Sequence, residues 1–120
     1  MKKKILISIP AYNEANNIRP LYKKLNETLE EKRDEVDFEI LFINDGSKDN
    51  TVSEVLSLIE QTDNVSLIDL SRNYGKEIAM SAGFDYSTHD AVITMDADLQ
   101  HPPATIIDMI DLWQQGYEDV

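Results

Sequence analysis

The chain is 120 residues long, contains no cysteine and has a formal net charge of −12, and this length suits one domain with a single hydrophobic core. The lack of cysteine excludes disulfides, thiolate nucleophiles and cysteine-ligated zinc, and it favours a cytoplasmic location. The acidic balance argues against a nucleic-acid-binding surface, but a phosphorylated small molecule can still bind if a metal ion supplies positive charge.

Four runs rich in apolar and β-branched residues alternate with four amphipathic segments. The runs cover residues 5–10, 38–44, 65–71 and 91–96, and their continuous apolar character is typical of strands buried on both faces of a parallel sheet. The first run is too short for the core of a signal peptide, and no stretch of the sequence approaches the roughly 20 apolar residues of a membrane span. Membrane association would therefore require segments outside this chain.

Residues at helical spacing predict a helix after each strand. The fourth helix is expected to begin at Pro102 and Pro103, which suit a first helical turn. The third helix, from about residue 76 to 85, carries small residues on one face, which favours close packing on the sheet or close approach to a ligand. The four stripes comprise Ile18, Leu21, Leu25 and Leu29; Val52, Val55, Leu56 and Ile59; Ala79, Ala82 and Gly83; and Ile106, Met109, Ile110 and Trp113.

The alternating order of strands and helices predicts an α/β fold of four βα units. We expect an open, doubly wound, mainly parallel sheet of the Rossmann-like type with right-handed crossovers. In such a sheet, ligands bind outside the carboxyl ends of the strands. Gly116 is expected to end the last helix, and the residues after it resemble the start of another strand. Residues 1–120 are therefore interpreted as a truncated piece of a longer domain.

Polar motifs follow the first two predicted strands. In the first motif, Pro10 ends the strand, Tyr12 can cover a base ring, and Glu14 can accept hydrogen bonds from a base or a sugar. An ordinary loop with an acidic residue near a helix N-terminus explains the same residues. In the second motif, Asp45 is placed to accept hydrogen bonds from the N–H groups of a base. A turn followed by a helix cap explains that motif equally well.

Two basic residues follow the third strand of this acidic chain. Arg72 and Lys76 lie at the predicted mouth of the sheet, beside the start of a helix, and both features attract phosphate. The alternative is that Arg72 forms a surface ion pair and Lys76 is a solvated helix residue. His89, in the polar turn before the fourth strand, is expected at the surface.

A run of oxygen ligands follows the fourth strand. Alternation along an extended segment places Asp96 and Asp98 on one side, with Gln100 next on the same side. Two carboxylates and an amide oxygen are hard ligands, which suit Mg²⁺ or Mn²⁺ bridging a diphosphate rather than zinc. The alternative is an exposed strand end followed by an acidic residue before a helix. His101 is expected to lie in that loop without binding the metal.

Together these motifs resemble the family-2 glycosyltransferases of GT-A fold, in particular the polyprenyl-phosphate branch that includes dolichyl-phosphate mannosyltransferase and the bactoprenol glucosyltransferases. The resemblance rests on IPAYNEANNI, INDGSKDNT, LSRNYGKEIAMSAGFDYS and ITMDADLQHPP, which occur in the family's order over almost the whole chain. Asn44 is a departure, since many members have a second aspartate there. The base-reading role belongs to the position of Asp45.

The resemblance implies that residues 1–120 are the nucleotide-sugar-binding part of a GT-A domain. It implies a UDP- or GDP-hexose donor, Mg²⁺ or Mn²⁺ on the leaving diphosphate, inversion at the anomeric carbon, and a polyprenyl phosphate acceptor at the cytoplasmic face of a membrane. The acceptor site would lie in later segments, so this chain alone is expected to bind nucleotide weakly without turnover. The residues implied are, for the nucleotide, Pro10, Tyr12, Glu14, Asp45, Arg72 and Lys76; for catalysis, Asp96 and Asp98; and for the metal, Asp96, Asp98 and Gln100.

Three other functions fit parts of the sequence. A receiver domain shares the length, the doubly wound sheet and an acidic Mg²⁺ site, but it needs paired acids after the first strand and an acceptor aspartate after the third, which this sequence lacks. A sugar-1-phosphate nucleotidyltransferase usually begins with a glycine-rich phosphate loop, and the first loop here has no glycine. A noncatalytic nucleotide-binding module is compatible with every motif.

Overall fold

A computed structural model of the chain describes residues 3–97 and 104–116. Its strands are β1 (Lys3–Ala11), β2 (Val36–Asp45), β3 (Val65–Leu70) and β4 (Ala91–Thr94). The strands alternate with helices α1 (Ala15–Leu29), α2 (Thr51–Gln61), α3 (Lys76–Tyr86) and α4 (Ala104–Gln114), and a short 3-10 helix, η1 (Glu30–Lys32), follows α1. This order confirms the predicted α/β fold of four βα units.

The described strands form one parallel sheet in the order β3-β2-β1-β4. The chain steps outward from β1 through β2 to β3 and then returns to the other side of β1 to form β4. The crossovers therefore reverse direction beside β1, which is the topological switch point of a doubly wound sheet. In the receiver-domain order the third strand lies beside the first, so the observed order argues against that alternative.

Strand β4 is shorter than the sequence pattern predicts. It pairs with β1 from Ala91 to Thr94, and the N–H of Met95 still donates to the carbonyl of Ser8 at 3.0 Å. The prediction of a strand to residue 96 was therefore wrong by two residues. Asp96 lies just beyond the hydrogen-bonded ladder.

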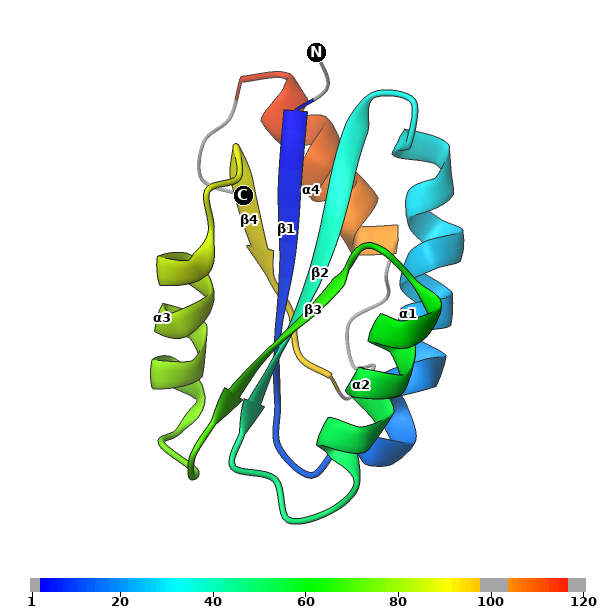
Figure 1. The fold of residues 1–120 in the computed structure, drawn as a ribbon. Coiled ribbons are helices and arrows are strands. Elements are labelled where there is room, and N and C mark those ends of the chain that lie inside the picture. The colour runs from blue at the N-terminus through cyan, green and yellow to red at the C-terminus, as the bar shows by residue number, and fades with distance from the viewer. Residues whose placement is uncertain (1–2, 98–103, 117–120) are drawn as a thin grey trace.

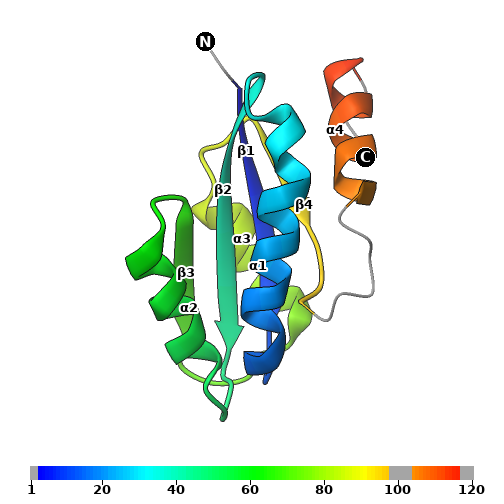
Figure 2. The ribbon, with the colours of Figure 1, turned by 90° about the vertical axis from the view of Figure 1, so that its right-hand side faces the viewer.

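Helices cover the two faces of the sheet unequally (Figures 1 and 2). Helices α1, α2 and α4 lie on one face, and α3 lies on the other. A large core fills the first face, and its buried members include Ile5, Ile7, Ile9, Ile18, Leu25, Phe42, Val55, Ile106 and Ile110. A smaller core lies under α3 and consists of Leu6, Leu41, Ile43 and Ala79.

The predicted helix stripes agree with burial except in α2. Leu58 of α2 is buried, whereas Leu56, which the pattern placed in the stripe, is exposed. In α3, the small-residue face packs on the sheet as expected, with Ala79 and Gly83 buried. A Cβ added to Gly83 would overlap the hydroxyl of Ser8 on β1. Glycine at this position therefore lets α3 approach the central strand closely.

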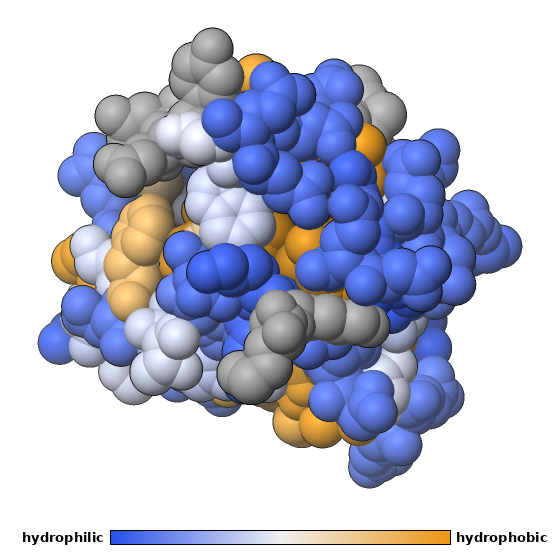
Figure 3. All heavy atoms as spheres, turned by 90° about the horizontal axis from the view of Figure 1, so that it is seen from above, coloured by the Kyte–Doolittle hydropathy of each residue, from blue (hydrophilic) through white to orange (hydrophobic). Residues whose placement is uncertain are grey.

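The amino-terminal end of the sheet presents a mostly hydrophilic surface with a few exposed apolar side chains (Figure 3). Here η1 is tied to α4, because Lys32 Nζ lies 2.5 Å from Asp111 Oδ1 and 3.3 Å from Gln114 Oε1. Within residues 3–97 and 104–116, no helix has the length and apolar character needed to cross a membrane.

Candidate nucleotide and metal site

A pocket of about 320 Å³ opens at the carboxyl ends of the strands, beside the switch point. Its walls come from the loop after β1, the end of β2, the start of α3 and the segment after β4. The lining residues are Pro10, Ala11, Tyr12, Glu14, Asp45, Lys76, Asp96 and Ala97. The structure therefore brings together most of the residues that the sequence motifs singled out, from four separate βα units.

The loops after β1 and β2 are joined by reciprocal hydrogen bonds. Asn13 has a left-handed backbone with φ of 54°, a conformation in which asparagine is enriched. Its N–H donates to Ser47 Oγ at 2.9 Å, and its Oδ1 accepts from the N–H of Lys48 at 2.8 Å. The carboxylate of Asp49 accepts backbone N–H groups at the starts of both α1 and α2. These contacts hold the two loops beside the pocket in a fixed position relative to each other.

Glu14 combines a structural contact with a position in the pocket. It is the N-cap residue of α1, and its Oε2 accepts a hydrogen bond from Asn17 Nδ2 at 2.6 Å. The helix-start interpretation of Glu14 is therefore correct. Its carboxylate nevertheless lines the pocket beside the half-exposed ring of Tyr12, so a nucleotide contact stays a prediction for both residues.

Asp45 is bound to a neighbouring loop. Its side chain is buried, with 5% exposed, and its Oδ1 and Oδ2 accept the N–H groups of Tyr74 at 2.8 Å and Gly75 at 3.1 Å. Gly75 has φ of 103° and immediately precedes α3. Asp45 on β2 thus anchors the loop that leads into α3, a role that its own local sequence does not reveal. Each oxygen keeps a second lone pair, so reading of a base by Asp45 stays a prediction.

Lys76, the first residue of α3, forms an ion pair across the pocket. Its Nζ lies 2.5 Å from Asp96 Oδ1, and the side chains are 58% and 29% exposed respectively. Lys76 is therefore neither a purely solvated helix residue nor a free phosphate ligand in this state. It contacts the first aspartate of the predicted metal motif.

Arg72 lies outside the pocket lining. Its guanidinium carbon is 5.3 Å from the ring centroid of Tyr74, which is a cation–π geometry. The hydroxyl of Tyr74 also lies 3.1 Å from Ser71 Oγ, and this hydrogen bond, together with Arg72, lowers the pKa of Tyr74. The structure therefore places Arg72 on the loop beside the pocket, and its predicted nucleotide contact stays a prediction.

The metal motif is only partly covered by the described residues. Asp98, Gln100 and His101 lie outside them, and within the described chain no three His, Cys, Asp or Glu side chains gather as a metal site. Asp96 by itself fits a hard cation, because its carboxylate faces a pocket whose other charged residues are Glu14, Asp45 and Lys76. Three carboxylates against one ammonium make the lining acidic, which suits a divalent cation.

Asn44, the departure from the family pattern, has a structural explanation. Its side chain is buried, its Nδ2 donates to Asp69 Oδ1 at 2.8 Å, and its Oδ1 accepts from the N–H of Ser47 at 3.1 Å. An aspartate at this position would place a second carboxylate against Asp69. The amide of Asn44 can donate a hydrogen bond to Asp69 on β3, which a carboxylate at this position could not do.

A second polar cluster, which the sequence motifs did not indicate, lies away from the pocket. Glu39 Oε1 lies 2.8 Å from His89 Nε2, and Glu39 Oε2 accepts from Ser66 Oγ at 2.7 Å and from the Tyr86 hydroxyl at 2.5 Å. His89 is only 10% exposed, so its predicted surface position was wrong. Burial alone would raise the pKa of Glu39, but the hydrogen bonds from Ser66, Tyr86 and His89 outweigh it and lower that pKa.

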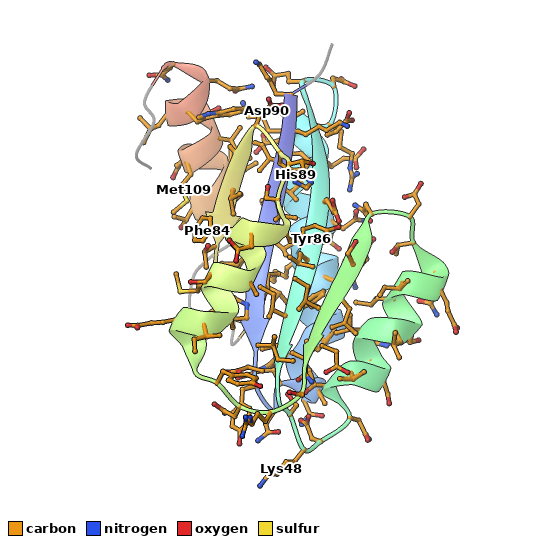
Figure 4. All side chains as sticks on the ribbon, turned by 60° about the vertical axis from the view of Figure 1, so that its left-hand side comes forward. Lys48, Phe84, Tyr86, His89, Asp90 and Met109 are labelled. Atoms are coloured by element: carbon orange, nitrogen blue, oxygen red, sulfur yellow. The ribbon has the colours of Figure 1, made fainter. Side chains whose placement is uncertain are left out.

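This cluster anchors the far end of α3. Figure 4 shows Tyr86 and His89 toward one end of the molecule and Lys48, in the loop after β2, at the other. The signal in the sequence was an acidic residue, Glu39, between the apolar residues Phe38 and Ile40 of a strand. Such a residue in a buried strand requires a partner, although nothing local identifies His89, fifty residues away.

The fold and the position of the pocket define a doubly wound α/β domain with a pocket at its switch point. The profile of Glycosyl transferase family 2 matches residues 6–120. The chain belongs to this family of glycosyltransferases, as the sequence motifs indicated. This membership decides against the receiver-domain and nucleotidyltransferase alternatives.

Curated relatives share more than two fifths of their aligned residues with the chain. An uncharacterized glycosyltransferase of Synechocystis sp. is 42% identical over 120 residues, covering 100% of this chain and 37% of that protein. The bactoprenol glucosyl transferase of Shigella phage SfX is 44% identical over 117 residues, covering 98% of this chain and 38% of that protein. The chain thus spans well under half the length of these relatives.

Solved structures of glycosyltransferases share the fold. A mannosyltransferase from Pyrobaculum calidifontis, in complex with GDP-Man and Mn²⁺, matches with a TM-score of 0.70 and 24% identity, covering 82% of this chain and 28% of that one. TarS from S. aureus, in complex with UDP-GlcNAc, matches with a TM-score of 0.72 and 21% identity, covering 96% of this chain and 32% of that one. These matches confirm the predicted GT-A type of sheet.

Proposed function

We propose that the protein containing this chain transfers a hexose from a UDP- or GDP-sugar to a polyprenyl phosphate, with inversion at the anomeric carbon. In this proposal, residues 1–120 are the donor-binding part, and the pocket at the carboxyl ends of β1, β2 and β4 holds the nucleotide diphosphate. The observation that carries the proposal is the meeting of Tyr12, Glu14, Asp45, Lys76 and Asp96 in that one pocket, in a chain that belongs to glycosyl transferase family 2.

The charges of the pocket support a metal-bound diphosphate. Glu14, Asp45 and Asp96 supply carboxylates and Lys76 supplies an ammonium, so a bare diphosphate would meet a net negative lining. Asp96 would hold Mg²⁺ or Mn²⁺, together with Asp98 and Gln100 if they follow the family pattern. When bound, such an ion supplies Lewis-acid stabilisation of the leaving diphosphate.

The chain's own residues would orient the donor. Tyr12 offers a half-exposed ring for the base, and Glu14 and Asp45 offer acceptor lone pairs toward base or sugar N–H and O–H groups. Lys76 lies where its ammonium can meet a phosphate oxygen near the helix N-terminus of α3. These contacts would hold the sugar still while the glycosidic bond breaks, which is a positioning contribution.

The acceptor part of the proposal rests on the relatives. Proteins named bactoprenol glucosyl transferase are 44% identical to this chain, and the oxygen of a lipid phosphate is already anionic, so it needs little general-base help. We place the transfer at the cytoplasmic face of a membrane, with the acceptor and the lipid bound by segments of the longer protein. The chain alone is expected to bind the donor weakly and not to turn over.

The experiment is a calorimetric titration of UDP and of GDP into this chain, each with and without Mn²⁺. An Asp96→Asn variant removes the described metal ligand, and Asp85→Asn is the matched control, because Asp85 is an exposed aspartate at the far end of α3. We expect Mn²⁺ to strengthen binding of one nucleotide at least tenfold, one decade being about 1.4 kcal/mol. Asp96→Asn should abolish that gain, and Asp85→Asn should retain it.

The titration also identifies the base of the donor, since Mn²⁺ should raise the affinity for only one of the two nucleotides. Binding of neither nucleotide in the presence of Mn²⁺ would overturn the donor assignment for this chain. If Asp85→Asn lost the Mn²⁺-dependent gain in affinity as fully as Asp96→Asn, net charge rather than the pocket would control binding.

A further inference from the structure

Two neighbouring residues of the β2 end, Asp45 and Gly46, hold the loop that precedes Lys76 in place. The carboxylate of Asp45 accepts the N–H groups of Tyr74 and Gly75, directly before α3 begins. On the other side, Gly46 lies so close to this loop that a Cβ on it would overlap the backbone of Asn73. The first turn of α3 therefore has little freedom to move, and the root of the Lys76 side chain is fixed beside the pocket.

The ammonium of Lys76 contacts a carboxylate oxygen of Asp96, the proposed metal ligand. Its Nζ lies 2.5 Å from Asp96 Oδ1, a distance that leaves no room for a cation between them. The two groups differ in exposure, because the lysine side chain is 58% exposed and the aspartate side chain 29%. The carboxylate is thus the less exposed partner, whereas the ammonium sits on a flexible, solvated stem that can leave.

The ion pair creates a competition. A divalent cation that binds Asp96 must displace the ammonium or bind with a positive charge a few ångströms away, and either course weakens metal binding. A nucleoside diphosphate removes this penalty, because it brings negative oxygens to which Lys76 can turn. Lys76 then leaves Asp96 and gains a phosphate partner in the same event, so that both Lys76 and Asp96 keep a partner of opposite charge.

We propose that Lys76 is an internal counter-cation of the donor site: it neutralises Asp96 in the empty protein, disfavours a divalent cation that arrives alone, and releases Asp96 to a cation that arrives with a diphosphate. This inference rests on the proposed function for the identity of the ligand that displaces Lys76. It makes Lys76 a regulator of the order in which metal and nucleotide bind, in addition to a phosphate contact.

The test is a titration of Mn²⁺ alone into this chain, with free Mn²⁺ followed by electron paramagnetic resonance and no nucleotide present. Lys76→Met keeps the length of the side chain and removes its charge. It should bind Mn²⁺ about threefold to tenfold more tightly than the wild-type chain, as expected when a partly exposed ion pair is removed. Lys76→Arg keeps the charge and should bind Mn²⁺ as weakly as the wild type.

Lys48→Met is the matched control. Lys48 is an exposed lysine in the loop after β2, at the same end of the molecule (Figure 4), and it is not among the residues that line the pocket. Its removal changes the net charge equally and should leave the Mn²⁺ affinity within about twofold, because exposed charges are screened by solvent and salt. Circular dichroism of each variant would verify that the fold is retained.

Equal Mn²⁺ affinity of Lys76→Met and the wild type, including the absence of binding by both, would overturn the inference. An equal gain in Lys48→Met would overturn it as well, since the effect would then come from net charge. The Mn²⁺ titration contains no nucleotide, so it is independent of the UDP and GDP titrations that test the proposed function. A gain in Lys76→Met without metal-dependent nucleotide binding by the wild type would support the competition at Asp96 and refute the donor assignment.

Discussion

Asp45 offers the sharpest test of how the pocket is built. Replacement by asparagine keeps the size of the side chain but removes its charge and turns one oxygen into an NH₂ group. Oδ1 of the new amide can still accept from one of the N–H groups of Tyr74 and Gly75, which now bond to the two carboxylate oxygens at 2.8 and 3.1 Å. The other N–H then faces a donor, so one hydrogen bond is lost and the remaining bond is no longer charge-assisted.

The expected cost follows from the energies of these bonds. A hydrogen bond to a charged group contributes about 1.5–3 kcal/mol, and Asp45 is buried, so solvent screens little of this contribution. We therefore expect Asp45→Asn to lower the free energy of unfolding by about 2 kcal/mol. Because the loop before α3 loses its anchor, the amides of Tyr74 and Gly75 should exchange with solvent about 30-fold faster, which is the same energy expressed as a ratio.

Urea denaturation measures the first quantity, and hydrogen exchange followed by NMR measures the second at single amides. Asp63→Asn is the control, because Asp63 is an exposed aspartate in the turn before β3 and its replacement removes the same charge. The control should change the free energy of unfolding by less than about 0.5 kcal/mol. An unchanged urea midpoint together with unchanged protection of both amides in Asp45→Asn would refute the role of Asp45 as the anchor of this loop.

Three further predictions concern residues that position the same strands and loops. Gly46→Ala should lower the free energy of unfolding by about 3 kcal/mol, measured by urea denaturation, because φ is 73° and the new Cβ would overlap the backbone of Asn73; a loss below about 1 kcal/mol would contradict this. Asn44→Asp should lower the free energy of unfolding by about 2 kcal/mol at pH 7, because it places a second carboxylate against Asp69. An added Asp69→Asn change should recover this lost stability. Glu39, whose pKa is lowered from 4.5, stabilises the folded state above that value and loses this contribution as pH falls through the folded pKa. In urea titrations, Glu39→Gln should therefore be less stable than the wild type at pH 7 by about 1 kcal/mol, and this difference should shrink as the pH falls below 4.5.

The elements of the fold could be predicted because their signals are local. Continuous apolar runs separated by stripes at helical spacing identify the four strands and four helices, and the rule of right-handed crossovers then restricts the sheet to few arrangements. The predictions were wrong where the outcome depended on how the elements pack against each other. Leu56 is exposed although its spacing fits the α2 stripe, and β4 ends at Thr94, opposite Ser8 of β1, although the apolar run continues to Met95.

The site could be predicted as a group of residues but not as a set of contacts. Switch-point topology brings every strand-end motif to one edge of the sheet, so the meeting of Glu14, Asp45, Lys76 and Asp96 follows from the chain order. Which of them bond to each other depends on distances of a few ångströms between different βα units. The ion pair between Lys76 and Asp96 therefore could not be predicted from the sequence.

The acidity of this chain and the anionic ligand that we propose for it are compatible only through local charges. A formal net charge of −12 produces a potential that opposes the approach of a nucleoside diphosphate. Lys76 does not reverse this by itself, because its ammonium is already matched to Asp96. A diphosphate that carries a divalent cation meets the carboxylates favourably and frees the ammonium for its own oxygens. The charges of the pocket thus favour metal-dependent binding, and a single diphosphate can bind where a nucleic acid, with many phosphates spread over an acidic surface, would be repelled.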